Sequence, residues 1–419
     1  MTVLRLAFAS LWNRRSTVVL TVLAIAMSVA LLLTVERVRH ETRNSFANTV
    51  SGTDLIVGAR SGSVQLLLYS VFRIGNATNN ISWESYQDIS RHPEVDWMLP
   101  VSLGDSHRGF RVMGTSQEYF ARFSYGRKRQ LRFDEGQQFD DVFDAVLGAQ
   151  VASELGYELG QSIVVSHGLG DGAIYTHDNQ PFQISGILAP TGTPVDRTIH
   201  VSLEGIEAMH VDWQSGAKIP GQNTSPDEIR QRELIPKAVT AALIGLKRKT
   251  STFRLQRFIN EYREEPLLAI LPGVALQELW GLLGVAEKAL FLVSLFVVLA
   301  GLVGLVAVLM AGLAERRREM AILRSVGARP WQVFGLLCLE SLLLTLIGIF
   351  IGLLLFYAVF LLGSKWLASS YGLDMALSLP LIREWGLLGL LAFAGLLAGA
   401  LPGLRAYSQS LADGMSIRV

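Results

Sequence analysis

The chain has 419 residues, half of them apolar, and a formal net charge of +1 at pH 7. A nearly neutral chain presents no strongly basic surface, which argues against nucleic acid as a partner. Its single cysteine, Cys338, excludes an intrachain disulfide.

Long apolar segments lie at the two ends of the chain. Residues 17–35 carry no charge, and as a helix they would cover about 29 Å, close to the thickness of a bilayer core. The other three apolar segments are of similar or greater length. We predict membrane-spanning helices at residues 17–37, 286–314, 331–363 and 386–405.

The positive charges between these segments predict the orientation, because Arg and Lys gather in short cytoplasmic loops. Arginines are frequent before the first span, between the second and third spans, and after the fourth. We therefore expect both ends (1–16 and 406–419) and the loop 315–330 in the cytoplasm of a bacterium. The segments 38–285 and 364–385 would lie outside the inner membrane.

The large exported segment has the pattern of a folded α+β domain. Short β-branched runs alternate with helical stretches, and both ends continue the neighbouring spans as polar, turn-free stalks. Strands are predicted at 54–57, 145–148, 162–165, 182–189, 198–201, 239–246 and 267–271. Helices are predicted at 82–90, 150–155, 203–210 and 251–262. Residues 212–237 resemble a long loop.

The loop between the second and third spans predicts a short amphipathic helix over residues 319–326. Gly327 suits the left-handed position that ends a helix, and Pro330 suits the first turn of the next one. Met320 and Leu323 would form its apolar stripe, with charged neighbours beside them. Such a helix at the membrane surface provides a binding surface for a cytoplasmic partner.

This loop resembles a known family. Residues 318–328, REMAILRSVGA, look like the signature of the FtsX/MacB/LolC-type permeases, also called type VII ABC transporters. Residues 6–16, 145–148, 187–194 and 401–406 are similar to further motifs of that family. The order of one span, an exported domain and three spans also matches. The sequence departs from the family at 407–410, where YSQS replaces a basic, proline-containing run.

The resemblance implies a homodimer, or a dimer with a homologous permease, bound to two copies of a separate ABC ATPase. The sequence lacks a Gly-x-x-x-x-Gly-Lys-Ser/Thr loop, so we expect ATP and Mg²⁺ on that partner, no cofactor on this chain and no enzyme activity of its own. In such proteins the loop helix couples the ATPase to the spans. The coupling residues would be Arg318, Glu319, Met320, Leu323, Arg324 and Gly327. The alternative is that the arginines only set topology and Glu319 is a solvated charge.

Two further patterns allow both a structural and a functional interpretation. The first consists of glycines at helix-packing spacing, which would serve packing within the chain or a dimer seam: Gly348, Gly352, Gly395, Gly399 and Gly403. The second is the apolar run 64–72, which would be a core element or a lip that touches a lipid or lipidated cargo. Its candidate contact residues are Leu66, Leu67, Leu68, Tyr69 and Phe72.

All seven histidines fall in the exported segment. His167 and His177 lie with two aspartates in a glycine-rich stretch and are weak metal candidates, because their spacing fits no predictable element. We predict no metal site from the sequence.

Three functions fit these observations. The first is export or extraction of a periplasmic or outer-leaflet cargo by mechanotransmission, with an adaptor or cargo protein as partner. The second is FtsX-like control of an extracytoplasmic enzyme. The third is a sensor linked to a metal or ligand.

Overall fold

The computed structural model describes residues 15–49, 51–126, 128–168, 177–214, 217–219, 224–315, 327–371 and 378–408. These residues form two compact units. The first unit takes its described residues from 1–41, 284–366 and 375–419, and the second from 42–283 and 367–374.

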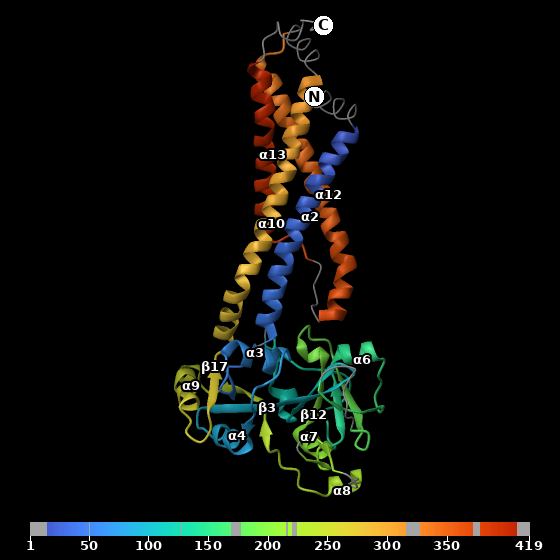
Figure 1. The fold of residues 1–419 in the computed structure, drawn as a ribbon, viewed down its shortest axis with the longest axis vertical. Coiled ribbons are helices and arrows are strands. Elements are labelled where there is room, and N and C mark those ends of the chain that lie inside the picture. Colours follow the sequence, from blue (N-terminus) through green and yellow to red (C-terminus); the bar gives the residue numbers. More distant parts are fainter. Residues whose placement is uncertain are drawn as a thin grey trace. The chain divides into compact units, whose positions relative to one another are not determined.

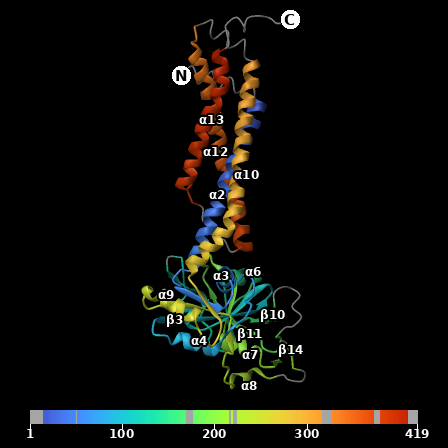
Figure 2. The same ribbon diagram turned by 60° about the vertical axis from the view of Figure 1, so that its left-hand side comes forward.

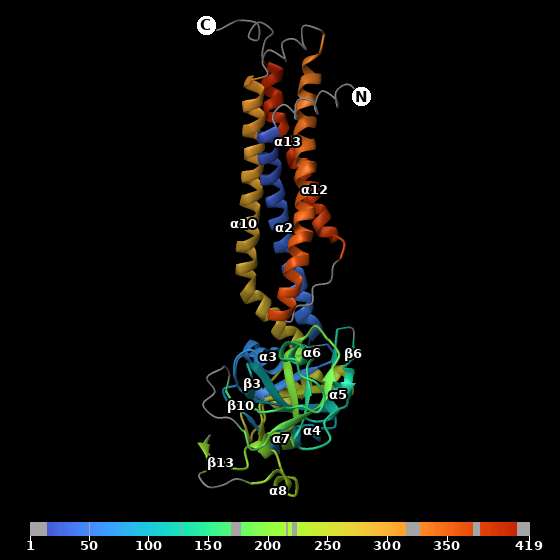
Figure 3. The ribbon, with the colours of Figure 1, turned by 90° about the vertical axis from the view of Figure 1, so that its right-hand side faces the viewer.

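Four long helices supply the first unit. They are α2 (Arg15–Thr49), α10 (Pro272–Glu315), α12 (Pro330–Tyr371) and α13 (Ile382–Ser408). Within the described ranges, all four are long and apolar enough to cross a membrane, which confirms the predicted spans. Their membrane segments run side by side in Figures 1 and 3. Helix α12 begins at Pro330, as predicted, and α2 and α10 both continue well beyond their apolar segments.

The second unit is an α+β domain, as predicted. Its helices are α3 (Ser63–Phe72), α4 (Trp83–Ser90), α5 (Glu118–Arg122), α6 (Ala149–Leu155), α7 (Leu203–Met209), α8 (Pro226–Arg230) and α9 (Thr252–Asn260), with 3-10 turns η1 (Pro194–Arg197) and η2 (Lys249–Ser251). Its strands are β1 (Leu55–Ala59), β2 (Ile81–Ser82), β3 (Val95–His107), β4 (Phe110–Thr115), β5 (Ser124–Tyr125), β6 (Arg129–Gln130), β7 (Phe133–Gly136), β8 (Asp144–Leu147), β9 (Ser162–Ile163), β10 (Ser166–His167), β11 (Phe182–Leu188), β12 (Thr198–Ser202), β13 (Trp213–Gln214), β14 (Ala217–Lys218), β15 (Ala238–Val239), β16 (Ala241–Leu246) and β17 (Leu267–Ile270).

Among the described residues, eleven strands form one mixed sheet. Its main path is β17-β1-β16-β3-β4-β12-β8-β11-β7, while β10 pairs with β3 and β9 with β11. The pairs β12/β4 and β11/β8 are parallel, and the other pairs on the path are antiparallel. Strand β3 is shared, because residues 95–101 pair with β16 and residues 102–107 pair with β4.

Alternate side chains of the β1/β16 region enter two different cores, as the pleat of a strand requires. Ile56 and Leu243 pack with α3 in one hydrophobic cluster. Val57 and Ile244 pack with α4 and α9 residues in another. Helices α3 and α4 accordingly lie on opposite sides of the sheet (Figures 1 and 2). The strands beyond β4 hold a third cluster with residues of α6 and α7.

Every predicted strand and helix of the domain is present, with bounds that differ by at most two residues, and the strand predicted at 239–246 is divided into β15 and β16. Several elements were not predicted, among them β2, β5, β6, β7, β10 and α5. The β3–β4 hairpin was not predicted either, because β3 contains Pro100 and Gly104, which are rare inside strands. Its turn uses Arg108 and Gly109, both at positive φ, as a two-residue hairpin turn needs.

The prediction of one long loop over residues 212–237 was wrong. The described part of this stretch contains the short β13/β14 hairpin and helix α8. A capping box between Ser225 and Glu228 stabilises the start of α8, and Pro226 occupies its first turn.

Candidate functional site

The predicted coupling helix 319–326 lies wholly outside the described residues, as does Arg318. Gly327, which follows it, has a φ of +104°. This is the positive φ expected where a helix ends at glycine. The coupling role of all six residues stays a prediction.

The ends of α2 and α10 that belong to the α+β domain pack on α3. The ring of Phe46, on α2, lies 4.3 Å from the ring of Phe72 and 5.5 Å from that of Trp280, on α10. The guanidinium of Arg43 lies 5.4 Å from the centre of the Trp280 ring. Ser63, in the first turn of α3, donates a hydrogen bond to Glu278. Both long helices are therefore anchored in the domain core by aromatic contacts.

Helix α3 is the predicted apolar run, and the structure makes it a core element. Leu66, Leu67, Tyr69 and Phe72 are buried, and Leu68 is partly buried against the same cluster. Side chains that fill the core cannot also contact a cargo. The cargo-lip hypothesis is thus replaced by a structural role, which is to seat the ends of α2 and α10.

The five glycines at helix-packing spacing all make close contacts within the chain. A Cβ on Gly348 or Gly352 would lie 2.6 Å or 2.7 Å from side chains of α2. A Cβ on Gly395, Gly399 or Gly403 would lie 2.2 Å, 2.7 Å or 2.7 Å from side chains of α12. Ser341, on α12, also donates to the carbonyl of Gly395 at 2.5 Å. This geometry favours packing within one chain over a dimer seam.

A buried ion pair joins α2 to the start of α13. Two nitrogens of Arg37 donate to the two carboxylate oxygens of Glu384 at 2.9 Å and 2.8 Å, and both side chains are at most 1% exposed. Arg37 also donates to the Ser378 hydroxyl, and Glu384 accepts from the backbone N–H of Leu381 at 2.7 Å. This pair was not predicted from the sequence, because its partners are 347 residues apart.

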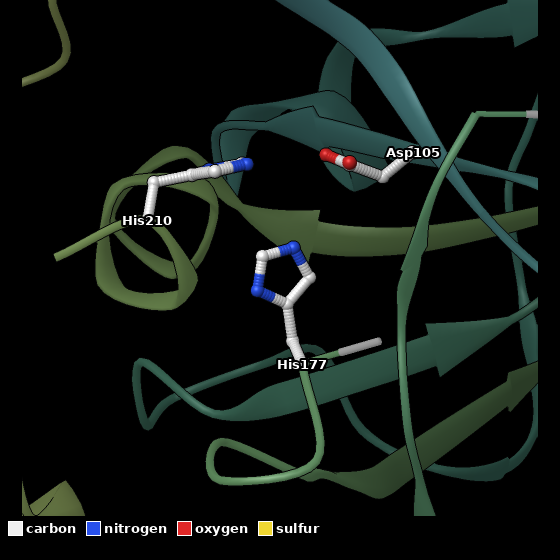
Figure 4. A group of neighbouring side chains, drawn as sticks. All are labelled: Asp105, His177 and His210. Carbon is white, nitrogen blue, oxygen red and sulfur yellow. The ribbon is translucent and has the colours of Figure 1, made fainter. Parts of the chain in front are cut away.

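The α+β domain gathers an acid and two histidines that the sequence separates widely. Asp105 lies on β3, His177 precedes the turn that leads to β11, and His210 follows α7. Ligand atoms from the three side chains all lie within 4.8 Å of one another. Figure 4 shows the two imidazoles and the carboxylate pointing toward a common centre. Of the two weak metal candidates, His177 belongs to this group, and the side chain of His167 lies outside the described part.

Two further histidines of the domain are buried, and burial lowers the pKa of each. His200, on β12, lies against the rings of Tyr119 and Phe120, and burial lowers its pKa to about 3. The nearby guanidinium of Arg73 contributes to this lowered pKa. Burial also lowers the pKa of His107, whose ring contacts the Val164 carbonyl and the Tyr157 hydroxyl. Burial thus favours the neutral ring of both side chains, which pack as core groups.

Comparison with known proteins assigns both parts of the chain. Residues 18–232 match the family described as MacB-like periplasmic core domain, and residues 291–411 match FtsX-like permease C-terminal. The macrolide export ATP-binding/permease protein MacB of Nitrosomonas europaea is 21% identical over 355 residues, which are 84% of this chain and 50% of that protein. The chain thus spans half the length of this relative.

Two solved structures are also similar. The periplasmic region of MacB from Actinobacillus actinomycetemcomitans is 10% identical, with a TM-score of 0.35, and the match covers 56% of this chain and 97% of that one. The extracellular domain of the transporter YknZ from Gram-positive bacteria is 11% identical, with a TM-score of 0.30, and the match covers 52% and 98%.

The two family matches together cover most of the apolar helices and the α+β domain up to residue 232. They agree with the four candidate spans of the described residues and identify a membrane protein with an extracytoplasmic domain. The chain belongs to the FtsX/MacB-type ABC permease family, with an FtsX-like permease region and a MacB-like periplasmic core domain.

Proposed function

We propose that this permease transmits ATP-driven motion from a separate ATPase subunit to its α+β domain, and so exports or extracts a periplasmic or outer-leaflet cargo. The chain would sit in the inner membrane with both ends in the cytoplasm. It would act as a dimer with two ATPase subunits. The orientation is supported by the arginines of the loop 315–330, and the partner by the family and by the name of the MacB relative.

One observation supports transmission in particular. Helices α2 and α10 are unbroken over 35 and 44 residues, and each ends or begins in the core of the α+β domain. At about 1.5 Å per residue they are about 52 Å and 66 Å long, against about 30 Å for a bilayer core. Phe46 of α2 packs on Phe72 of α3, and Trp280 of α10 packs on Phe46. These contacts fix the position of both long helices in the domain. A displacement of either helix would therefore act directly on α3.

The first test is purification of the tagged chain from its host in mild detergent. We expect an ABC ATPase in equal amount with the wild-type chain. The double variant Glu319→Ala/Arg324→Ala should lose either binding of the ATPase or the coupling of ATP hydrolysis to function. The matched control Arg329→Ala, which removes another arginine of the same loop, should keep both binding and coupling. Absence of any ATPase from the wild-type preparation would contradict the proposal.

The same complex tests the stalk anchors. Hydrogen exchange of α3 should change when the ATPases are trapped with ATP and vanadate in the wild type. The variant Trp280→Ala should still bind a hydrolysing ATPase but lose this change, because α10 no longer has its aromatic seat. An identical response in wild type and variant would show that motion does not pass through this contact.

A further inference from the structure

We infer that Asp105, His177 and His210 form a binding site for a divalent transition-metal ion, and that zinc is the ion this ligand set suits best. The inference concerns the α+β domain alone and does not depend on the transmission proposal. The site combines one carboxylate with two imidazoles, whose ligand atoms lie within 4.8 Å of one another.

The position of His210 suits a metal ligand. Its Nδ1 lies 2.6 Å from the backbone carbonyl of Ile206, one turn earlier on α7. A carbonyl can only accept a hydrogen bond, so Nδ1 carries the proton and the neutral ring has its lone pair on Nε2. Metal-bound histidines typically use their second nitrogen in this way, which fixes both the tautomer and the ring orientation.

The other two ligands are held by buried backbone. The N–H of His177 donates to the Val165 carbonyl at 2.9 Å, and its carbonyl accepts from Gln180 at 3.1 Å. Its ring, 2% exposed, packs 4.6 Å from the ring of Trp213. Asp105 is 4% exposed near the end of β3, where β10 pairs alongside. These contacts keep the three side chains near one another without requiring the ion to order them.

The segment after His210 is also fixed. The Trp213 N–H donates to the His210 carbonyl at 3.0 Å. The buried carboxylate of Asp212 accepts two hydrogen bonds from Thr224, at 2.9 Å and 2.6 Å. The aromatic wall that Trp213 presents to His177 is therefore part of an ordered structure, as second layers around metal sites usually are.

The chemistry of the three ligands selects the ion. Two imidazoles and a carboxylate are a common zinc set, with a fourth position for water or an external ligand. Calcium and magnesium prefer oxygen ligands only. Ligand atoms around zinc lie about 3.3 Å apart when bonds of about 2.0 Å point to a tetrahedron. The present spread of up to 4.8 Å would close by small side-chain rotations.

The test uses the full chain in detergent after removal of metal with a chelator. Zinc is added, free metal is removed, and metal content is measured by mass spectrometry. We expect about one zinc per chain, a higher thermal midpoint with zinc, and a visible spectrum of four-coordinate geometry when cobalt replaces zinc. The variants are His177→Ala, His210→Ala and the isosteric Asp105→Asn. Each should weaken zinc binding at least about tenfold.

The matched control is His92→Ala, which removes a histidine of the same domain that lies at the end of α4. It should bind zinc like the wild type. The site assignment is overturned if the wild type retains no zinc, or if Asp105→Asn, which preserves side-chain shape, binds zinc as tightly as His92→Ala does. Preference for iron(II) over zinc in a competition would overturn the choice of ion, because iron(II) generally binds such ligands more weakly than zinc does.

Discussion

Arg37 on α2 and His200 on β12 are both almost completely buried, one among the membrane-spanning helices and the other in the α+β domain. Arg37 keeps its charge next to the carboxylate of Glu384, with further hydrogen bonds on both partners. Among the described residues no carboxylate contacts His200, and its ring is held neutral instead, because burial and Arg73 disfavour the protonated form. A buried ionisable group is thus either compensated or neutralised, and Arg37 and His200 illustrate the two solutions.

The largest effect should come from breaking the compensation. We expect Arg37→Ala to lower the free energy of unfolding by about 3–5 kcal/mol, because Glu384 would remain as a buried unpaired charge. The measurement is unfolding of the purified chain by denaturing detergent.

The double variant Arg37→Met/Glu384→Met removes both charges and should recover most of this loss. Arg383→Ala is the control, because that side chain is 63% exposed although it also binds a glutamate of α2. Equal losses of unfolding free energy in Arg37→Ala and Arg383→Ala would show that burial of the Arg37–Glu384 pair does not affect stability.

An intermediate effect should follow acidification. The ordinary pKa of histidine is about 6.5, and that of folded His200 is about 3. Above pH 6.5 both states are neutral; below it only the unfolded chain takes up the proton. Stability should therefore fall by about 1.4 kcal/mol per pH unit, or about 2 kcal/mol between pH 7 and pH 5.

The contribution of His200 is found by comparing slopes. The variant His200→Gln should lose this part of the pH dependence, whereas His92→Gln should keep it. Melting curves at pH 7, 6 and 5 give the three slopes. A wild-type slope that persists in His200→Gln would assign the acid sensitivity to another group.

The smallest effect concerns apolar packing. The helices of the first unit approach one another at glycines, because apolar side chains gain little from leaving lipid for protein. We expect Gly399→Ala to destabilise the chain by about 1–2 kcal/mol, since the added Cβ would lie 2.9 Å from the Cα of Cys338. Detergent unfolding measures the change.

Gly389, on the same helix, has open space where a Cβ would be. Gly389→Ala should therefore be neutral or stabilising, because alanine favours helix over glycine by about 1 kcal/mol. The same sign for both variants would mean that close approach at Gly399 is not required.

Local signals were enough to predict most elements. The spans follow from uncharged length and the start of α12 from Pro330. The apolar run of α3 left helix and strand open, because a short buried segment of either kind can be apolar throughout.

Non-local partners could not be predicted from one sequence. Arg37 and Glu384 each look like an ordinary charge at the end of a span, and only the fold brings them together. The ligands Asp105, His177 and His210 lie on three separate elements, so no spacing along the chain marks them. His210 at the end of a predicted helix was the one local signal, and alone it is too common to indicate a site.

Strand β3 has a thermodynamic consequence for the whole α+β domain. Its first seven residues pair with β16, in the half of the sheet that holds α3. Its last six residues, which include Asp105, lie along β4. Neither half of the sheet can open without breaking hydrogen bonds on this shared strand. Although the domain contains three hydrophobic clusters, its two halves are thereby linked into a single cooperative unit, which favours one melting transition over independent loss of either half.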